Sequence, residues 1–405
     1  LQQLYWGGRL AATDRVPKAR PVREWASFDS SYTTTPQEYA GWGAGLFVEP
    51  ALKVSFADGN RDLVLHYESH TTTGDGFEVV LADIQREISV TLQYAMDPES
   101  GILKRSATIE NREGEPVTLE QVAAAAWALP PAHYTLSYLT GRWVGEWRLT
   151  QETLRPGARV LESRRGSTSH QTNPWFAIQA GAPDEDHGEV WFGALAWSGS
   201  WRITVEQDQL DGVRVTGGFN PFDFGYVLHP GERLETPVFY GGYSAHGLGG
   251  ASRLQHRYQL EHILPRRVKA GAGAVPPPRP VIYNSWEATH FNVTEANQMA
   301  LAEKAAALGI DRFVMDDGWF GQRASDRAGL GDWYVNPQKF PQGLKPLIDK
   351  VHSLGMDFGL WVEPEMVNPD SDLYREHPEW VLSFPGRPRS EARNQLVLNL
   401  ARTDV

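Results

Sequence analysis

Residues 311–317 read DRFVMDD, a short apolar run that ends in two adjacent aspartates. Such a run, bounded by polar residues, is typical of a buried β-strand. Burying a carboxylate at the end of a strand costs free energy unless another group pairs with it or hydrogen-bonds to it. Asp316 and Asp317 therefore mark both a predicted strand and a candidate functional site.

Two segments of the same kind lie on either side of this one in the sequence. RPVIYNSW, residues 279–286, and DFGLWVE, residues 357–363, also read as strands. Helices are predicted between the three strands, one from Thr294 as N-cap to Leu308 and one over residues 343–355. This alternation of strand and helix predicts parallel βα units of the (β/α)₈, or TIM-barrel, type.

The first 247 residues show a different pattern. In ISVTLQY, residues 88–94, and WRITVE, residues 201–206, apolar residues alternate with polar ones. A period of two is typical of half-buried strands, so this region predicts a large antiparallel β-sandwich.

A boundary segment is predicted between the sandwich and the βα units. Residues 248–264 read as a helix, and VKAGAGAVPPPRP, residues 268–280, is rich in Gly, Ala and Pro, as an extended linker would be. The predicted organisation is a β-supersandwich domain over 1–247, the helix and linker over 248–280, and a barrel part over 281–405.

The barrel part is short for its predicted fold. A (β/α)₈ barrel usually needs about 250 residues, and only residues 281–405 follow the linker. We expect the chain to stop partway through a barrel, and its start at Leu1 rather than Met predicts a missing segment there too. A small open α/β domain is the alternative.

Composition narrows the classes of function. A net charge of −12 argues against a nucleic-acid partner, and no apolar run approaches the roughly 18 residues of a membrane span. The chain has no cysteine, which fits a reducing compartment such as the cytoplasm. Its 12 histidines are scattered along the sequence, so we expect neither a metal nor another cofactor.

The chain has 15 tryptophans, whose faces could stack on sugar rings or simply fill a large β core. Several of them lie with carboxylates at predicted strand ends, where TIM barrels place their sites. These residues are Trp286 and Glu287, then Asp316, Asp317 and Trp319, then Trp361, Glu363 and Glu365. Each acid could instead cap a helix, and one of the adjacent aspartates could be structural. As a group they suit a sugar and suggest a glycosidase that uses a carboxylate pair.

Several long motifs make the resemblance to a known family specific. RPVIYNSWEATHF, RFVMDDGWFGQR and FGLWVEPEMVNPDSDLYREHPEW resemble the bacterial α-galactosidases of glycoside hydrolase family 36, and so do LYWGGRL and GFNPFDFGYVLHPGE in the sandwich. The resemblance covers essentially the whole chain. It implies a β-supersandwich, a (β/α)₈ barrel and a small C-terminal β domain.

By this resemblance, the substrate-binding residues are Trp286, Asp316, Asp317, Trp361 and Arg393. The two aspartates would bind the O4 and O6 hydroxyls of galactose, the tryptophans would line the pocket, and Arg393 would donate to a hydroxyl. The family's nucleophile and acid/base aspartates lie in later motifs that do not occur before Val405. The resemblance thus implies a retaining hydrolase and no catalytic residue within these 405.

The implied function is release of terminal α-galactose from melibiose- and raffinose-type sugars by a homo-oligomer, a tetramer by resemblance. Alternatives are an α-N-acetylgalactosaminidase or a galactosyltransferase of the same family. A non-catalytic galactose-binding protein is favoured only if Val405 is the natural end. Trp143 and Trp147 could reach the pocket from the sandwich or pack between the domains.

Overall fold

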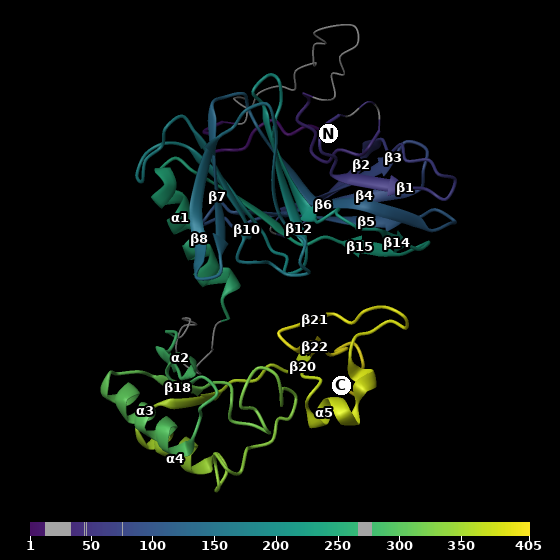
Figure 1. Ribbon diagram of the computed structural model, residues 1–405. Coiled ribbons are helices and arrows are strands. Elements are labelled where there is room, and N and C mark those ends of the chain that lie inside the picture. Colours follow the sequence, from purple (N-terminus) through teal and green to yellow (C-terminus); the bar gives the residue numbers. More distant parts are fainter. Residues whose placement is uncertain (13–33, 44, 46, 75, 266–277) are drawn as a thin grey trace. The chain divides into compact units, whose positions relative to one another are not determined.

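The computed structural model describes residues 1–405 except 13–33, 44, 46, 75 and 266–277 (Figure 1). The chain divides into two compact units, Leu1–Pro265 and Arg266–Val405. The predicted boundary segment, residues 248–280, is shared between them. Its helical part belongs to the first unit, whereas residues 266–277 of the predicted linker lie outside the described residues.

The first unit contains two antiparallel sheets. The six-stranded sheet has the order β1 (Leu52–Ser55), β6 (Val117–Leu129), β13 (Val213–Phe219), β12 (Trp201–Gln207) and β9 (Gly157–Ser163), with β14 (Tyr226–Leu228) also paired to β6. The ten-stranded sheet has the order β2 (Leu65–Thr72), β3 (Gly76–Asp83), β4 (Ile88–Met96), β5 (Leu103–Asn111), β16 (Phe239–Ser244), β11 (Val190–Leu195), β10 (Thr172–Ala180), β7 (Tyr134–Arg142) and β8 (Gly145–Thr153), with β15 (Arg233–Glu235) beside β5.

The two largest hydrophobic clusters of this unit share strand β6. Leu119 and Val122, in its first half, pack with residues of β3, β4 and β5. Trp127 and Leu129, in its second half, pack with residues of β7, β10, β12 and β13. In β4 the alternating apolar residues are all buried, as a period of two predicts; they are Ile88, Val90, Leu92 and Tyr94.

The predicted helix after the sandwich is confirmed. Helix α1 (Gly247–Tyr258) continues as a π-helical turn over Gln259–Ile263. Its buried Ala251 and Tyr258 pack with Ala177 and Phe192, which lie on β10 and β11 of the ten-stranded sheet. The helix therefore covers one face of that sheet.

The hairpin between β7 and β8 carries two exposed tryptophans. Trp143 is 76% exposed and Trp147 is 71% exposed, and Val144 between them has a φ of 56°. A contact of these side chains with the predicted sugar pocket or with the barrel stays a prediction. None of the helices within the described residues is long and apolar enough to span a membrane.

The second unit begins with three parallel strands in the order β17 (Ile282–Asn284), β18 (Arg312–Met315) and β19 (Asp357–Leu360). Ile282 pairs with Arg312, and Phe313 pairs with Phe358. A short helix α2 (Trp286–Thr289) and helix α3 (Glu295–Ala307) follow β17, and helix α4 (Lys345–Ser353) precedes β19 (Figure 1). The predicted parallel βα arrangement is confirmed.

Local signals set the ends of these helices. The Thr294 hydroxyl accepts from Asn297 N while the Asn297 side chain accepts from Thr294 N, a capping box at the start of α3. Gly309, with a φ of 78°, follows the end of that helix. On α4, Leu347 and Val351 are fully buried and pack in the same cluster as Phe313 of β18.

The remainder of the second unit forms a small antiparallel sheet in the order β20 (Met366–Val367), β22 (Gln395–Val397) and β21 (Glu391–Ala392). Helix α5 (Asp372–Glu376) and a 3₁₀ turn over Pro378–Trp380 lie between β20 and β21 in the sequence. Residues Arg393 and Asn394 form the tight turn between β21 and β22, with φ of 53° and 60°.

Candidate functional site

The carboxyl ends of the three parallel strands bring most of the predicted site residues to one edge of the sheet. Ser285 N donates to Val314 O at 3.1 Å, and Trp361 N donates to Met315 O at 2.9 Å. The backbone pairing thus continues just past each strand. Because the strands are parallel, Ser285, Asp316 and Trp361 all follow at the same edge.

Asp316 is held by the chain on either side of it and by the neighbouring strand. Its side chain accepts from Asn284 Nδ2 at 2.6 Å and from the backbone N of Asp317 at 2.7 Å. Its own N donates to the hydroxyl of the fully buried Ser285 at 3.1 Å. Asn284 also accepts from Trp286 N at 2.8 Å, so one amide orients both Asp316 and the start of α2.

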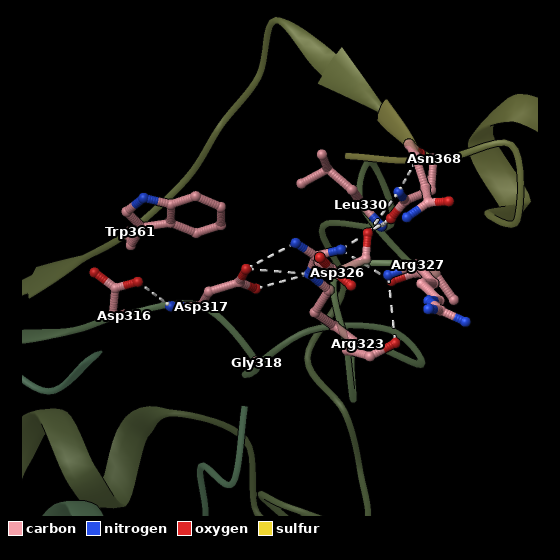
Figure 2. A network of polar contacts seen from close by, with 12 residues as sticks. Asp316, Asp317, Gly318, Arg323, Asp326, Arg327, Leu330, Trp361 and Asn368 are labelled. Carbon is pink, nitrogen blue, oxygen red and sulfur yellow. Dashed lines mark hydrogen bonds and ion pairs between the residues drawn. The ribbon is translucent and has the colours of Figure 1, made fainter. Parts of the chain in front are cut away.

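Asp317 has a different partner. Both of its carboxylate oxygens contact the guanidinium of Arg323, with Nε–Oδ1 at 2.9 Å and Nη2–Oδ2 at 2.8 Å (Figure 2). Asp317 is 5% exposed and Arg323 is 1% exposed, so this ion pair is buried. Strand β18 ends at Met315, so both aspartates lie beyond it, and both carboxylates are hydrogen-bonded.

Aromatic side chains border the two aspartates. Trp361 is half-buried, and its carbonyl accepts from Nε1 of the buried Trp319 at 3.0 Å. The Trp361 ring stacks at 6.4 Å and 19° on Phe320, a fully buried residue of the loop after β18. Trp286 is half-buried and packs edge-on against Phe291 at 5.1 Å.

The remaining predicted groups lie after β19 and in the small sheet. Glu363 is half-buried, and burial raises the pKa of its carboxyl, with a further rise from the nearby Glu365. The Arg393 and Arg323 cations oppose that rise in the pKa of Glu363. Arg393 itself is exposed.

Three buried or half-buried residues of this site had no role in the sequence-based prediction. They are Arg323, which binds Asp317, Asn368, which binds Arg323, and Lys339, which binds three backbone carbonyls. Burial lowers the pKa of the Lys339 ammonium, and the Asp317 carboxylate opposes this effect. The sequence offered one signal, Arg323 in the segment GWFGQR directly after the aspartates.

Gly318 allows the chain to turn directly after Asp317. Its φ is 105°, and a Cβ on this residue would lie 2.9 Å from Phe291 O. We expect Gly318→Ala to lower the free energy of unfolding of this unit by about 2–3 kcal/mol, because backbone strain adds to overpacking. Gly309→Ala is the matched control, since its φ is 78° but nothing lies within 4 Å, and about 1 kcal/mol is expected there. Equal losses in urea unfolding would contradict the close-approach argument.

Within the part of the chain that the structure describes, no group of three or more His, Cys, Asp or Glu side chains is arranged to hold a metal ion. The groups present at the strand ends are carboxylates, amides, guanidinium groups and aromatic faces. This set hydrogen-bonds hydroxyls and stacks on apolar ring faces.

Comparison with family models gives two matches that together span nearly all of the chain. Residues 1–229 match the glycosyl hydrolase family 36 N-terminal domain, and residues 233–405 match the melibiase model. The second match contains the strand-end residues described above. The order of these two matches agrees with the predicted fold class, which is a β-supersandwich followed by the first part of a (β/α)₈ barrel.

Known relatives and solved structures agree with the family models. The chain is 38% identical to α-galactosidase AgaA of Geobacillus stearothermophilus and 36% identical to α-galactosidase Mel36A of Lactobacillus acidophilus, over 100% of this chain and 58% of each relative. The crystal structure of AgaA superposes with a TM-score of 0.91 at 38% identity, covering 100% of this chain and 59% of that one. Further AgaA structures contain stachyose or raffinose. The chain thus spans somewhat over half the length of these relatives.

Proposed function

Because the chain belongs to glycosyl hydrolase family 36, we propose that it forms part of an α-galactosidase. The proposed enzyme removes terminal non-reducing α-D-galactose from melibiose- and raffinose-type oligosaccharides. The observation that carries the proposal is the pair of buried, hydrogen-bonded aspartates, Asp316 and Asp317, beside Trp361 at the strand ends. The relatives named above, all α-galactosidases, support it, as do the raffinose and stachyose in the AgaA structures.

The proposed binding roles follow from the hydrogen-bonding capacity of each group. An ionised carboxylate has about four acceptor sites. The protein contacts described for Asp316 and Asp317 therefore leave room for the O4 and O6 hydroxyls of galactose. A site that bonds a hydroxyl strongly rejects a ligand that lacks the hydroxyl there, so axial O4 would separate galactose from glucose. Trp286 and Trp361 would contact the sugar's apolar face, and Arg393 would donate to a hydroxyl.

The proposed chemistry is a retaining double displacement. One carboxylate attacks the anomeric carbon and a second carboxylic acid protonates the leaving oxygen, with the two groups roughly 5–5.5 Å apart. We place both groups beyond residue 405, in the part of the relatives' length that this chain does not span. No residue within the chain is proposed as catalytic.

The proposed partner is a galactose-containing oligosaccharide, with no nucleic acid and no membrane. A homotetramer, which the family resemblance implies, and a cytoplasmic location complete the proposal. Light scattering of the full-length protein tests the first of these, and cell fractionation tests the second.

The test of the function compares two proteins, the 405-residue chain and the product that extends to the stop codon of its gene. We expect only the extended protein to hydrolyse p-nitrophenyl α-galactoside. Turnover by the 405-residue chain would contradict the absence of catalytic residues and would require Asp316, Asp317, Glu363 and Glu365 to be tested as the pair.

The same assay separates the alternatives. A preference for the α-N-acetylgalactosaminide indicates the related aminidase, and galactosyl transfer to sucrose indicates a transferase. Galactose binding without turnover by the extended protein indicates a binding protein. Each of these outcomes would contradict the α-galactosidase proposal.

A further inference from the structure

Arg323 contacts Asp317 in a geometry that fixes the plane of the carboxylate. Nε lies 2.9 Å from Oδ1 and 3.2 Å from Oδ2, and Nη2 lies 2.8 Å from Oδ2 (Figure 2). Two N–H groups of a planar fork thus meet both carboxylate oxygens. Such a bidentate contact sets orientation as well as charge, which a lysine ammonium does not do.

The Nη1 group of the Arg323 guanidinium, which does not contact Asp317, is also held by hydrogen bonds. Nη1 donates to Asn368 Oδ1 at 2.9 Å and to Ala328 O at 3.2 Å. The cation also lies 5.2 Å from the centre of the Phe291 ring. The Arg323 backbone O accepts from Lys339 Nζ at 3.0 Å. Arg323 therefore has little freedom to follow a carboxylate that moves.

Asn368 extends the contacts to a second part of the site. It is fully buried, and its Nδ2 donates to Asn394 O at 2.7 Å. Its Oδ1 accepts from Leu330 N at 2.9 Å in addition to Arg323. Asn394 forms the turn with Arg393, and both residues have positive φ. One run of hydrogen bonds thus links Asp317 to the turn that carries Arg393.

We propose that Arg323 is a positioning residue for sugar binding, which fixes the direction in which Asp317 accepts a galactose hydroxyl. The inference rests on the proposed function. With the guanidinium on one side of the carboxylate, the remaining acceptor positions of Asp317 face away from Arg323. The orientation of the bound hydroxyl then depends on a side chain that does not touch the sugar.

A purely structural ion pair is the competing explanation, because buried pairs also occur without any role at a site. The two explanations predict different results for a substrate that lacks the hydroxyl bound by Asp317. If Arg323 acts through Asp317, its replacement harms only those substrates that have the hydroxyl bound by Asp317. If Arg323 only stabilises the fold, its replacement harms all substrates by the same factor.

The experiment uses the protein expressed to its natural stop codon and three substrates, p-nitrophenyl α-galactoside and its 4-deoxy and 6-deoxy analogues. The kinetics of Asp317→Asn first identify the hydroxyl that Asp317 binds. On the deoxy analogue that lacks this hydroxyl, Asp317→Asn should no longer lower kcat/KM. We expect Arg323→Lys to lower kcat/KM for the parent substrate by about 10–100-fold, since small displacements at a site have effects of this size. On the analogue that lacks the identified hydroxyl, the loss should be about threefold or less.

Two further variants keep the test decisive. Asn368→Ala leaves the Asp317–Arg323 contact in place and should give the same pattern with a smaller loss, even if Arg323→Lys folds poorly. Arg105→Lys is the matched control, because Arg105 is 3% exposed and pairs with Glu38 in the sandwich. It should alter thermal stability and leave the ratio between the substrates unchanged.

The outcomes separate this inference from the proposed function. An equal loss on all three substrates for both Arg323→Lys and Asn368→Ala overturns the positioning role while the α-galactosidase proposal stands. A wild-type full-length protein that neither hydrolyses nor binds α-galactosides overturns both.

Discussion

Asp317→Asn in the full-length protein is expected to lower kcat/KM for p-nitrophenyl α-galactoside by about two to four orders of magnitude. The substitution removes the negative charge that strengthens the hydrogen bonds from Arg323 and, in our proposal, those from the sugar. Hydrogen bonds to a charged group contribute about 1.5–3 kcal/mol each, and two of them account for an effect of this size. Steady-state kinetics on the purified variant measures it.

The same substitution has a second consequence that must be measured separately. It leaves the Arg323 cation, which is 1% exposed, without its counter-charge. Removing one partner of a buried ion pair costs about 3–5 kcal/mol of folding free energy. Urea unfolding of the variant, followed by tryptophan fluorescence, gives this value and shows whether the protein assayed is folded.

A matched control for Asp317 lies in the same unit. Asp357 pairs with Arg312 at 2.9 Å, but its side chain is 67% exposed. Exposed pairs of this kind contribute about 0–1 kcal/mol, so Asp357→Asn should leave both activity and stability near the wild-type values. If Asp317→Asn kept kcat/KM within about threefold of wild type while folded, the proposed sugar contact at Asp317 would be wrong.

Lys339→Met is expected to lower the free energy of unfolding of the second unit by about 3–5 kcal/mol. The Lys339 ammonium donates to three backbone carbonyls, Phe291 O at 3.0 Å, Gly318 O at 2.6 Å and Arg323 O at 3.0 Å. Methionine has a similar length but no donor, so all three carbonyls lose a partner. Each unpaired group costs about 1–3 kcal/mol where water cannot replace the bond.

The positions of the three carbonyls bound by Lys339 should confine the effect of Lys339→Met to one part of the second unit. Gly318 directly follows Asp317, and Phe291 packs against both Trp286 and Arg323. Hydrogen exchange should therefore show faster exchange in residues 318–336 than elsewhere in the unit. Lys345→Met is the control, because Lys345 is 80% exposed and pairs with the exposed Asp349. A loss below about 1 kcal/mol for Lys339→Met would show that water replaces the ammonium.

The sequence was sufficient to predict the elements that periodicity and capping control. Alternation predicted β4 and β12, Thr294 and Gly309 marked the two ends of α3, and the spacing of apolar runs predicted that β17, β18 and β19 pair in parallel. Each of these features has a local signal in the sequence, even where the strands that pair are far apart in the chain. That is why they could be read without a structure.

The contacts that organise the site could not be predicted in this way. Arg323 and Asn368 are 45 residues apart and lie in segments without regular periodicity. Asp316 and Asp317 lie beyond β18, which ends at Met315, so the alternation of side chains along a strand does not predict where they point. The binding roles of Trp286, Asp316, Asp317, Trp361 and Arg393 stay predictions until the variants are measured.

The single long strand β6 makes the sandwich a cooperative unit. Its 13 residues cross from one hydrophobic cluster to the other, so displacement of β6 from one cluster would disturb the packing of the other. Melting of one half should therefore propagate along the strand, and partly unfolded forms of the sandwich should be scarce at equilibrium. For anyone engineering this protein, a stabilising substitution in either cluster would then protect the whole sandwich against heat.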